Sequence, residues 1–104
     1  SIAGISGNSF TFLGFVPLKK GRQTFFKSLP EYDIPVIFYE APHRIMKTLE
    51  SLKENIPEDR KVIIARELTK MFEEVVSGSP EEVLQYFIDH PDHIRGEFVV
   101  LIDV

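Results

Sequence analysis

Hydrophobic positions along the chain fall into short continuous runs and into runs with helical spacing. Four continuous runs have the length of a β-strand: residues 10–16, 35–39, 61–65 and 98–102. Because residues 35–39 are apolar at successive positions, they are expected to form a strand inside the sheet with both faces covered. A fifth strand is expected at residues 72–76, which would form an antiparallel hairpin with the third.

Three segments have the apolar spacing and the boundary residues of helices. Residues 22–29 predict a short helix that Pro30 stops. A second helix is expected to begin at Pro42, and its apolar residues recur at spacings of four, three and four: Ile45, Leu49, Leu52 and Ile56. In the third, Ser79 and Glu82 have the spacing of a capping box. The order βαβαββαβ predicts a single α/β layered domain with a mixed sheet of about five strands and three to four helices.

Composition narrows the class of protein. The chain has 104 residues, 43% of them hydrophobic, which suits one compact domain. It contains no cysteine, so disulfides, thiolate catalysis and cysteine-ligated zinc are excluded. No apolar run has the length of a membrane span and no secretory pattern opens the chain, so a cytoplasmic protein without a membrane partner is expected. Because the chain begins at Ser1 without a methionine, a truncated product is expected.

Charge is unevenly distributed along the chain. The formal net charge of −4 argues against nonspecific binding of nucleic acid. Residues 17–47, however, hold six basic and three acidic side chains, a net charge of +3, whereas the residues from 48 onward hold six basic and thirteen acidic ones, a net charge of −7. A local basic face is therefore possible.

Two strand-to-helix turns are candidate ligand sites, because ligands of open α/β sheets bind beyond the carboxyl ends of strands. The first, FYEAPHR at residues 38–44, places a carboxylate, an imidazole and the Arg44 guanidinium around a helix start, where anions are favoured. A solvated helix start explains the same residues. In the second, residues 76–80, Gly78 permits close approach of a ligand, although helix capping alone also accounts for this turn.

Basic residues after the first predicted strand are candidates for contacting nucleic acid: Lys19, Lys20 and Arg22. Phe15 and Phe25 flank them, and both aromatic side chains are expected in the core. Residues 66–70 mix both charge signs at the predicted hairpin bend, where they could contact phosphates or keep the turn solvated. His90 and His93 lack further ligand residues, so a frayed helix end is expected there and no metal site is predicted.

Several motifs follow one another along the chain: FLGFVP at 12–17, KKG at 19–21, FYEAPHR at 38–44, ARELTK at 65–70, FEEV at 72–75, Gly78, and GEFV at 96–99. In this order they resemble signatures of the small-subunit ribosomal RNA (cytidine-2′-O-)-methyltransferases, which are part of the tetrapyrrole (corrin/porphyrin) methylase-like superfamily. The likeness covers nearly the whole chain. It departs from the family at Ala41, where serine is usual and would cap the following helix.

The resemblance implies that residues 1–104 are the C-terminal domain of a two-domain methyltransferase whose N-terminal domain is absent from this chain. In that family S-adenosylmethionine lies between the two domains. Two turns would then approach the cofactor, with six residues in contact: Tyr39, Glu40, Ala41, Ser77, Gly78 and Ser79. Seven basic residues become candidates for binding ribosomal RNA of the small subunit through its phosphates: Lys19, Lys20, Arg22, His43, Arg44, Arg66 and Lys70.

Methyl transfer to a ribose hydroxyl needs an aligned oxygen and is often helped by a base. Glu40 and Glu67 are the candidate acids, although both could instead pair with Arg44 or Arg66, and the catalytic groups could lie on the absent domain. The isolated chain is expected to be inactive.

Two other interpretations stay open. The chain could belong to a methyltransferase of tetrapyrroles or other small molecules, for which the basic motifs at 43–44 and 66–70 argue poorly. It could also be a non-catalytic α/β binding or dimerisation module. An exposed apolar patch is expected where the absent domain would pack, and it could support a homodimer.

Overall fold

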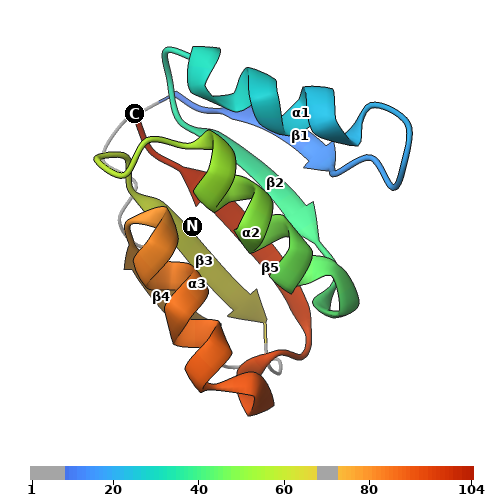
Figure 1. Cartoon of the computed structure of the whole chain (residues 1–104), viewed down its shortest axis with the longest axis vertical. Coiled ribbons are helices and arrows are strands. Elements are labelled where there is room, and N and C mark those ends of the chain that lie inside the picture. Colours follow the sequence, from blue (N-terminus) through green and yellow to red (C-terminus); the bar gives the residue numbers. More distant parts are fainter. Residues whose placement is uncertain (1–8, 68–72) are drawn as a thin grey trace.

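The computed structural model describes residues 9–67 and 73–104 of the chain. Within these residues, five strands form one mixed sheet in the order β1-β2-β5-β3-β4 (Figure 1). The strands and helices are β1 (Thr11–Phe15), α1 (Arg22–Ser28), β2 (Val36–Glu40), α2 (Ile45–Asn55), β3 (Val62–Glu67), β4 (Glu73–Gly78), α3 (Pro80–Asp89) and β5 (Glu97–Ile102). The predicted fold class and order of elements are confirmed, as is the antiparallel hairpin of β3 and β4.

Strand directions decide which loops lie together. β1 runs parallel to β2, whereas β5 runs antiparallel to both β2 and β3. The carboxyl ends of β1, β2 and β3 therefore lie at the same edge of the sheet, which we call the carboxyl edge. β4 runs antiparallel to β3 and ends at the opposite edge.

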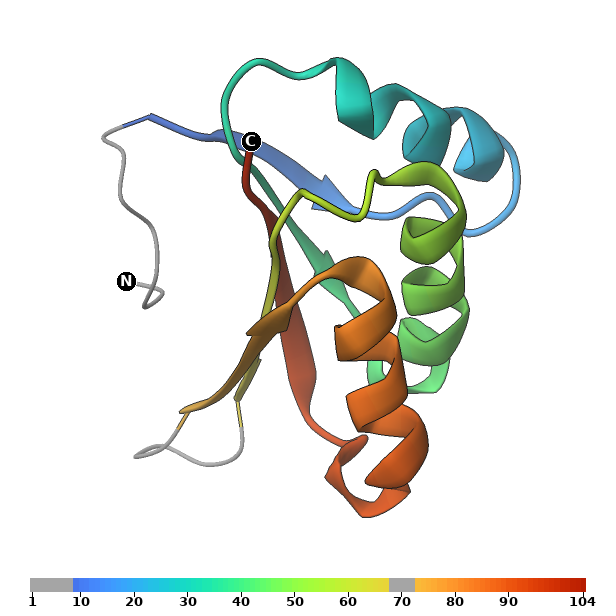
Figure 2. The same ribbon diagram turned by 60° about the vertical axis from the view of Figure 1, so that its left-hand side comes forward.

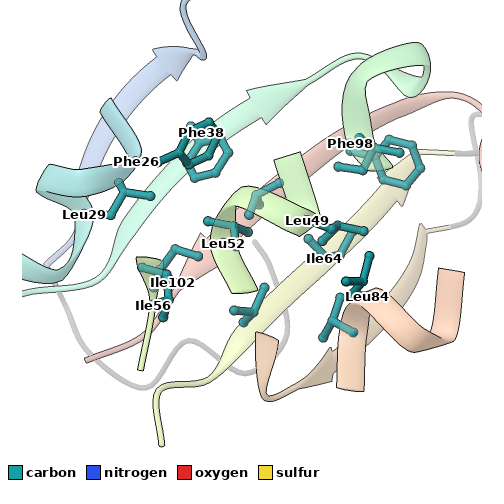
Figure 3. Close-up of a cluster of buried hydrophobic side chains, with 14 of the residues drawn as sticks. Phe26, Leu29, Phe38, Leu49, Leu52, Ile56, Ile64, Leu84, Phe98 and Ile102 are labelled. Carbon is teal, nitrogen blue, oxygen red and sulfur yellow. The ribbon is translucent and has the colours of Figure 1, made fainter. Parts of the chain in front are cut away.

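All three α-helices pack on one face of the sheet (Figures 1 and 2). The core lies between this face and the helices (Figure 3), with fully or nearly fully buried side chains that include Phe26, Leu29, Phe38, Leu49, Leu52, Ile64, Phe98 and Ile102. A smaller cluster of Ile37, Ile63 and Leu101 lies on the other face, which we call the second face. No described helix covers the second face. Within residues 9–67 and 73–104, the helices lack the length and apolar character needed to span a membrane.

The two proline predictions have different outcomes. The helix α1 ends at Ser28, before Pro30 as predicted, although Leu29 and Pro30 lie in a 3-10 turn, Leu29–Glu31. Pro42 begins a second 3-10 turn, Pro42–Arg44, and α2 starts only at Ile45. The Arg44 amide donates to the carbonyl of Ala41, three residues earlier, at 3.1 Å. Because Ala41 has no side-chain acceptor to cap a helix, this tighter turn satisfies the first amides instead.

A β-bulge changes the direction of Phe15, which had been expected in the core. Side chains alternate along a regular strand, so Phe12 and Phe15 would point to opposite faces. The pairing of β1 with β2 shifts between Phe12 and Gly14, and Gly14 has a φ of 75°, which glycine adopts without strain. Phe12 and Phe15 consequently align with Ile37 and Tyr39 on the second face. The expectation for Phe15 was therefore wrong, and its side chain is 61% exposed.

The predicted capping box of α3 is confirmed, and it provides a test of the fold. The Ser79 hydroxyl accepts from the Glu82 amide at 3.2 Å, and the Glu82 carboxylate accepts from the Ser79 amide at 2.9 Å. We expect Ser79→Ala to lower the free energy of unfolding in urea by about 1 kcal/mol. Ser77→Ala, on exposed β4, is the matched control and should change it by less than about 0.5 kcal/mol. Equal effects of the two substitutions would contradict this account.

Candidate functional site

The carboxyl edge brings together basic residues that are far apart in the sequence. Lys19, Lys20 and Arg22 follow β1, His43 and Arg44 follow β2, and Arg66 lies near the end of β3. Six of the seven predicted RNA contacts thus lie along one edge. The seventh, Lys70, lies outside the described residues. Glu67 is the last residue of β3, at the same edge, and its backbone aligns with those of Glu73 and Glu97.

Glu40, the last residue of β2, is a carboxylate buried beneath this edge. Its side chain is only 1% exposed. Oε1 accepts hydrogen bonds from the Ala41 amide at 2.8 Å and from Arg44 Nε at 3.2 Å. Oε2 accepts from the Thr48 hydroxyl at 2.5 Å. A buried carboxylate needs such partners, because removing its charge from water without them is costly.

Arg22 joins the loop after β1 to the same carboxylate. Its Nη1 lies 3.8 Å from Glu40 Oε2, and its Nη2 donates to the Thr48 hydroxyl at 3.1 Å. Nη1 also donates to the Pro17 carbonyl at 3.4 Å, and the guanidinium lies 5.1 Å from the centre of the Phe26 ring. Three segments therefore meet at Glu40: the start of α1, the β2–α2 turn and α2. Arg22 also joins the β1–α1 loop to them through the Pro17 carbonyl. We call Arg22, Glu40, Arg44 and Thr48 the Glu40 network.

This geometry favours the structural alternative for Glu40 over a role as the base. Both carboxylate oxygens already accept hydrogen bonds within the chain, and solvent barely reaches the side chain. Sequence reasoning missed Thr48, although a signal was present. It lies between Ile45 and Leu49 in the buried stripe of α2, where a polar residue needs a polar partner.

A second buried guanidinium, that of Arg66, is also held within the chain. Arg66 Nη2 lies 2.7 Å from Glu74 Oε1 on the neighbouring strand, and Nη1 donates to the carbonyl of His93. The side chain of Arg66 is 5% exposed. Arg66 therefore connects the segment before β5 to the β3–β4 hairpin. This contact joins residues that are distant in the sequence.

His90 and His93 fasten the end of α3, so the expectation of a frayed helix end was wrong. The His93 ring Nδ1 lies 3.0 Å from the Tyr86 hydroxyl and 3.2 Å from Glu74 Oε1. The His90 ring stacks on Tyr86 at 4.3 Å between centres. Burial, followed by the nearby Glu74 carboxylate, raises the pKa of Tyr86 above its ordinary value of 10.0. Among the described residues, no group of three or more histidine or acidic side chains is arranged to hold a metal ion.

The two turns proposed for the cofactor lie at opposite edges of the sheet. Gly78 is level with Val36, and Glu40 is four residues farther along β2. The turns are therefore about 13 Å apart along the strands and about 14 Å apart across the sheet. The prediction that both turns contact one S-adenosylmethionine molecule stays a prediction.

Neither turn forms a complete cofactor site by itself. The Ala41 amide donates to Glu40, and its carbonyl accepts from Arg44. The hydroxyl and amide of Ser79 are used in the capping box. A Cβ added to Gly78 would lie 2.8 Å from Glu82 Oε1, so the capping contact already accounts for glycine there. The described residues thus do not form a site for the cofactor unaided.

Comparison with known proteins places this site in context. No family model matches the chain. The chain is 33% identical over 102 residues to "Ribosomal RNA small subunit methyltransferase I" of Haemophilus influenzae, covering 97% of the chain and 36% of that protein. The protein of the same name from Neisseria meningitidis serogroup A is 40% identical over 103 residues, and the chain covers 35% of it. That from Coprothermobacter proteolyticus is 45% identical over 95 residues, 89% of the chain and 40% of that protein.

The chain is homologous to one segment of these methyltransferases. The predicted resemblance is thereby confirmed, and the segment spans well under half of the relatives' length. The fold agrees with solved structures of tetrapyrrole methyltransferases. The methyltransferase CobJ matches with a TM-score of 0.61 at 18% identity over 90% of the chain and 40% of that protein. Cobalt precorrin-4 methyltransferase CbiF matches with a TM-score of 0.61 at 13% identity over 91% of the chain and 40% of that protein.

The role of Glu40 is tested by Glu40→Gln, which keeps the shape of the side chain but removes its charge. We expect the free energy of unfolding to fall by about 2 kcal/mol, because Arg22 and Arg44 lose a charged hydrogen-bond acceptor. Glu50→Gln, on the exposed side of α2, should change it by less than about 0.5 kcal/mol. A Glu40→Gln variant with unchanged stability but no catalytic activity in the intact protein would instead identify a base.

The environment of Tyr86 is tested by titrating phenolate absorbance in the wild type and in Tyr86→Phe. We expect the difference between the two curves to have its midpoint above pH 10.0. Because the folded-state pKa lies above the unfolded one, Tyr86 leaves stability unaffected below pH 10.0 and lowers it as pH rises further. The wild type should therefore lose stability more steeply than Tyr86→Phe above that pH. A difference midpoint at or below 10.0 would contradict the partly buried position of Tyr86 beside Glu74.

Proposed function

We propose that the intact protein containing this chain is an S-adenosylmethionine-dependent methyltransferase of the cytoplasm that acts on a ribose 2′-hydroxyl of small-subunit ribosomal RNA. The chain supplies RNA contacts and one wall of the cofactor cleft. The names of its homologues support this substrate, and the resemblance of motifs to the 2′-O-methyltransferases supports the position of the methyl group.

The arrangement of basic residues at the carboxyl edge carries the proposal. Lys19, Lys20 and His43 are exposed there, on two loops that the Glu40 network holds together. Arg22 and Arg66 make internal hydrogen bonds instead. We therefore divide the predicted RNA contacts into two groups: exposed side chains that contact phosphates and arginines that position them. Phosphate contacts of this kind orient RNA without reading its sequence.

The chain outside this edge is acidic overall. The overall charge is −4, yet the exposed cations Lys19 and Lys20 lie side by side in the loop that follows β1. A polyanion is repelled by a net negative surface but attracted to a local basic one, so the charge pattern orients RNA toward the carboxyl edge.

Residues of the protein outside this chain carry out the chemical step. When bound, S-adenosylmethionine supplies an activated methyl group. Glu40 is occupied in the Glu40 network, and the polar groups of Ala41 and Ser79 are paired within the chain. We propose that most cofactor contacts and any base that deprotonates the ribose come from outside residues 1–104. The isolated chain is accordingly inactive.

The direct test incubates the intact protein with S-adenosylmethionine and small-subunit RNA that lacks the modification. Nucleoside mass spectrometry should detect one 2′-O-methylated nucleoside in the digested RNA, and the isolated chain should produce none. Methylation of a tetrapyrrole or another small molecule, with no methylation of RNA, would overturn the proposal. A methyl group on a base instead of a ribose would retain the RNA substrate and overturn the assigned position.

The charge argument predicts how salt affects RNA binding. We expect Lys19→Ala/Lys20→Ala to weaken binding of the intact protein to single-stranded RNA. The slope of log affinity against log salt should fall by about 1.4, because each lysine that neutralises a phosphate contributes about 0.7 to it. The control Lys53→Ala/Lys61→Ala removes two exposed cations near the opposite edge and should leave both quantities unchanged. Equally weakened binding in both double variants would show a diffuse charge effect instead of a local site.

A further inference from the structure

Three aromatic side chains form an exposed cluster on the second face of the sheet. The rings of Phe12 and Phe15 each lie 5.3 Å from the ring of Tyr39, centre to centre. The residues are 54%, 61% and 37% exposed, respectively. We call these three residues the aromatic ridge. Its rings support one another edge to face or at a tilt, which keeps them in place while leaving ring surface accessible.

The ridge exists because of a local departure from regular strand geometry. The bulge at Gly14 brings Phe15 to the same face as Phe12, and without it a regular strand would send Phe15 toward the helices. Burying a phenylalanine would stabilise the fold, so an exposed one gives up that gain. β-Bulges that redirect a side chain in this way are common next to functional sites.

The ridge adjoins the basic loops of the carboxyl edge. Phe15 ends β1, and the exposed Lys19 and Lys20 follow in the next loop. Tyr39 is the penultimate residue of β2, and the exposed His43 lies in the turn beyond it. Basic side chains thus border one end of the ridge, and the carboxylate of Glu40, the residue after Tyr39, is buried and paired.

We propose that the aromatic ridge stacks unpaired bases of the RNA substrate while Lys19, Lys20 and His43 contact the adjoining phosphates. Sequence-tolerant stacking on exposed rings, together with cations that follow the backbone, is how proteins bind single-stranded RNA. The inference rests on the proposed function and adds to it a surface that recognises bases. Because only unpaired bases can stack on the rings, the RNA must be single-stranded where the ridge binds it.

The exposed side chains around the ridge favour RNA bases over a protein as its partner. The aliphatic side chains at the middle of the second face, Ile37, Ile63 and Leu101, are buried, whereas the three rings of the ridge are exposed. Of the exposed aliphatic residues, Leu18 lies in the loop next to Lys19, and Val75 lies on β4, at the far side of the sheet. A partner protein packed on this face would be expected to use aliphatic and aromatic positions alike, whereas a base needs only the ring surface.

The test measures binding of the intact protein to an oligocytidylate of about ten nucleotides by fluorescence anisotropy. We expect Phe15→Leu and Tyr39→Leu each to weaken binding roughly tenfold, because leucine retains apolar bulk but offers no ring for stacking. The slope of log affinity against log salt should stay unchanged, because no phosphate contact is removed. Phe10→Leu is the matched control: it alters a phenylalanine that is 49% exposed just before β1, outside the ridge, and should bind like the wild type.

Two further measurements keep the inference falsifiable if a variant folds poorly. Irradiation of wild-type protein bound to RNA containing 4-thiouridine should crosslink peptides that contain Phe15 or Tyr39, and crosslinks confined to other peptides would overturn the inference. Sedimentation should show the same oligomeric state for the wild type and the leucine variants. A changed oligomeric state with unchanged RNA affinity would assign the ridge to a protein contact instead.

The outcomes also separate this inference from the function on which it rests. If the intact protein methylates RNA and the leucine variants bind RNA like the wild type, the ridge is not a base-binding surface and the proposed function stands. If the wild type neither binds nor methylates RNA, the proposed function fails and the inference fails with it. Weaker binding by the two leucine variants alone, with Phe10→Leu unaffected, supports both.

Discussion

The arrangement of the carboxyl edge depends on one buried charge, the carboxylate of Glu40. A carboxylate that is 1% exposed is tolerated only if charged and polar partners replace water around it. Those partners come from three separate segments, through Arg22, Arg44 and Thr48. Because each partner is fixed by the same carboxylate, the loop that carries Lys19 and Lys20 keeps a defined position against the turn that carries His43.

Strand direction then decides what this edge can do. β1, β2 and β3 run in the same direction and end at one edge, whereas β4 ends at the other, at the turn of residues 77–79. Among the described residues, helices cover only one face of the sheet (Figure 2), and the rings of the aromatic ridge are exposed on the other. Exposed rings near basic loops are features that proteins use to bind single-stranded RNA.

Much of the fold could be predicted from the sequence because its signals are local. The apolar runs, the helical spacing of α2 and the capping box of α3 each depend on neighbouring residues, and all three predictions are confirmed. The motifs likewise indicated the homologous methyltransferases. Predictions that required pairing between distant segments were less successful. Phe15 was assigned to the core because the register shift at Gly14 is visible only when β1 is paired with β2. The internal roles of Arg22 and Arg66 likewise depend on partners 26 and 27 residues away.

The central claim is that the carboxyl edge is the side of this domain that meets RNA. Hydrogen exchange of the intact protein, with and without bound RNA, tests it most directly because it reports on every segment at once. The account predicts slower exchange on RNA binding in peptides that cover residues 15–22 and 39–44, and unchanged exchange in peptides that cover residues 53–62, at the opposite edge. Protection confined to the opposite edge or to the outer surfaces of the helices would contradict it.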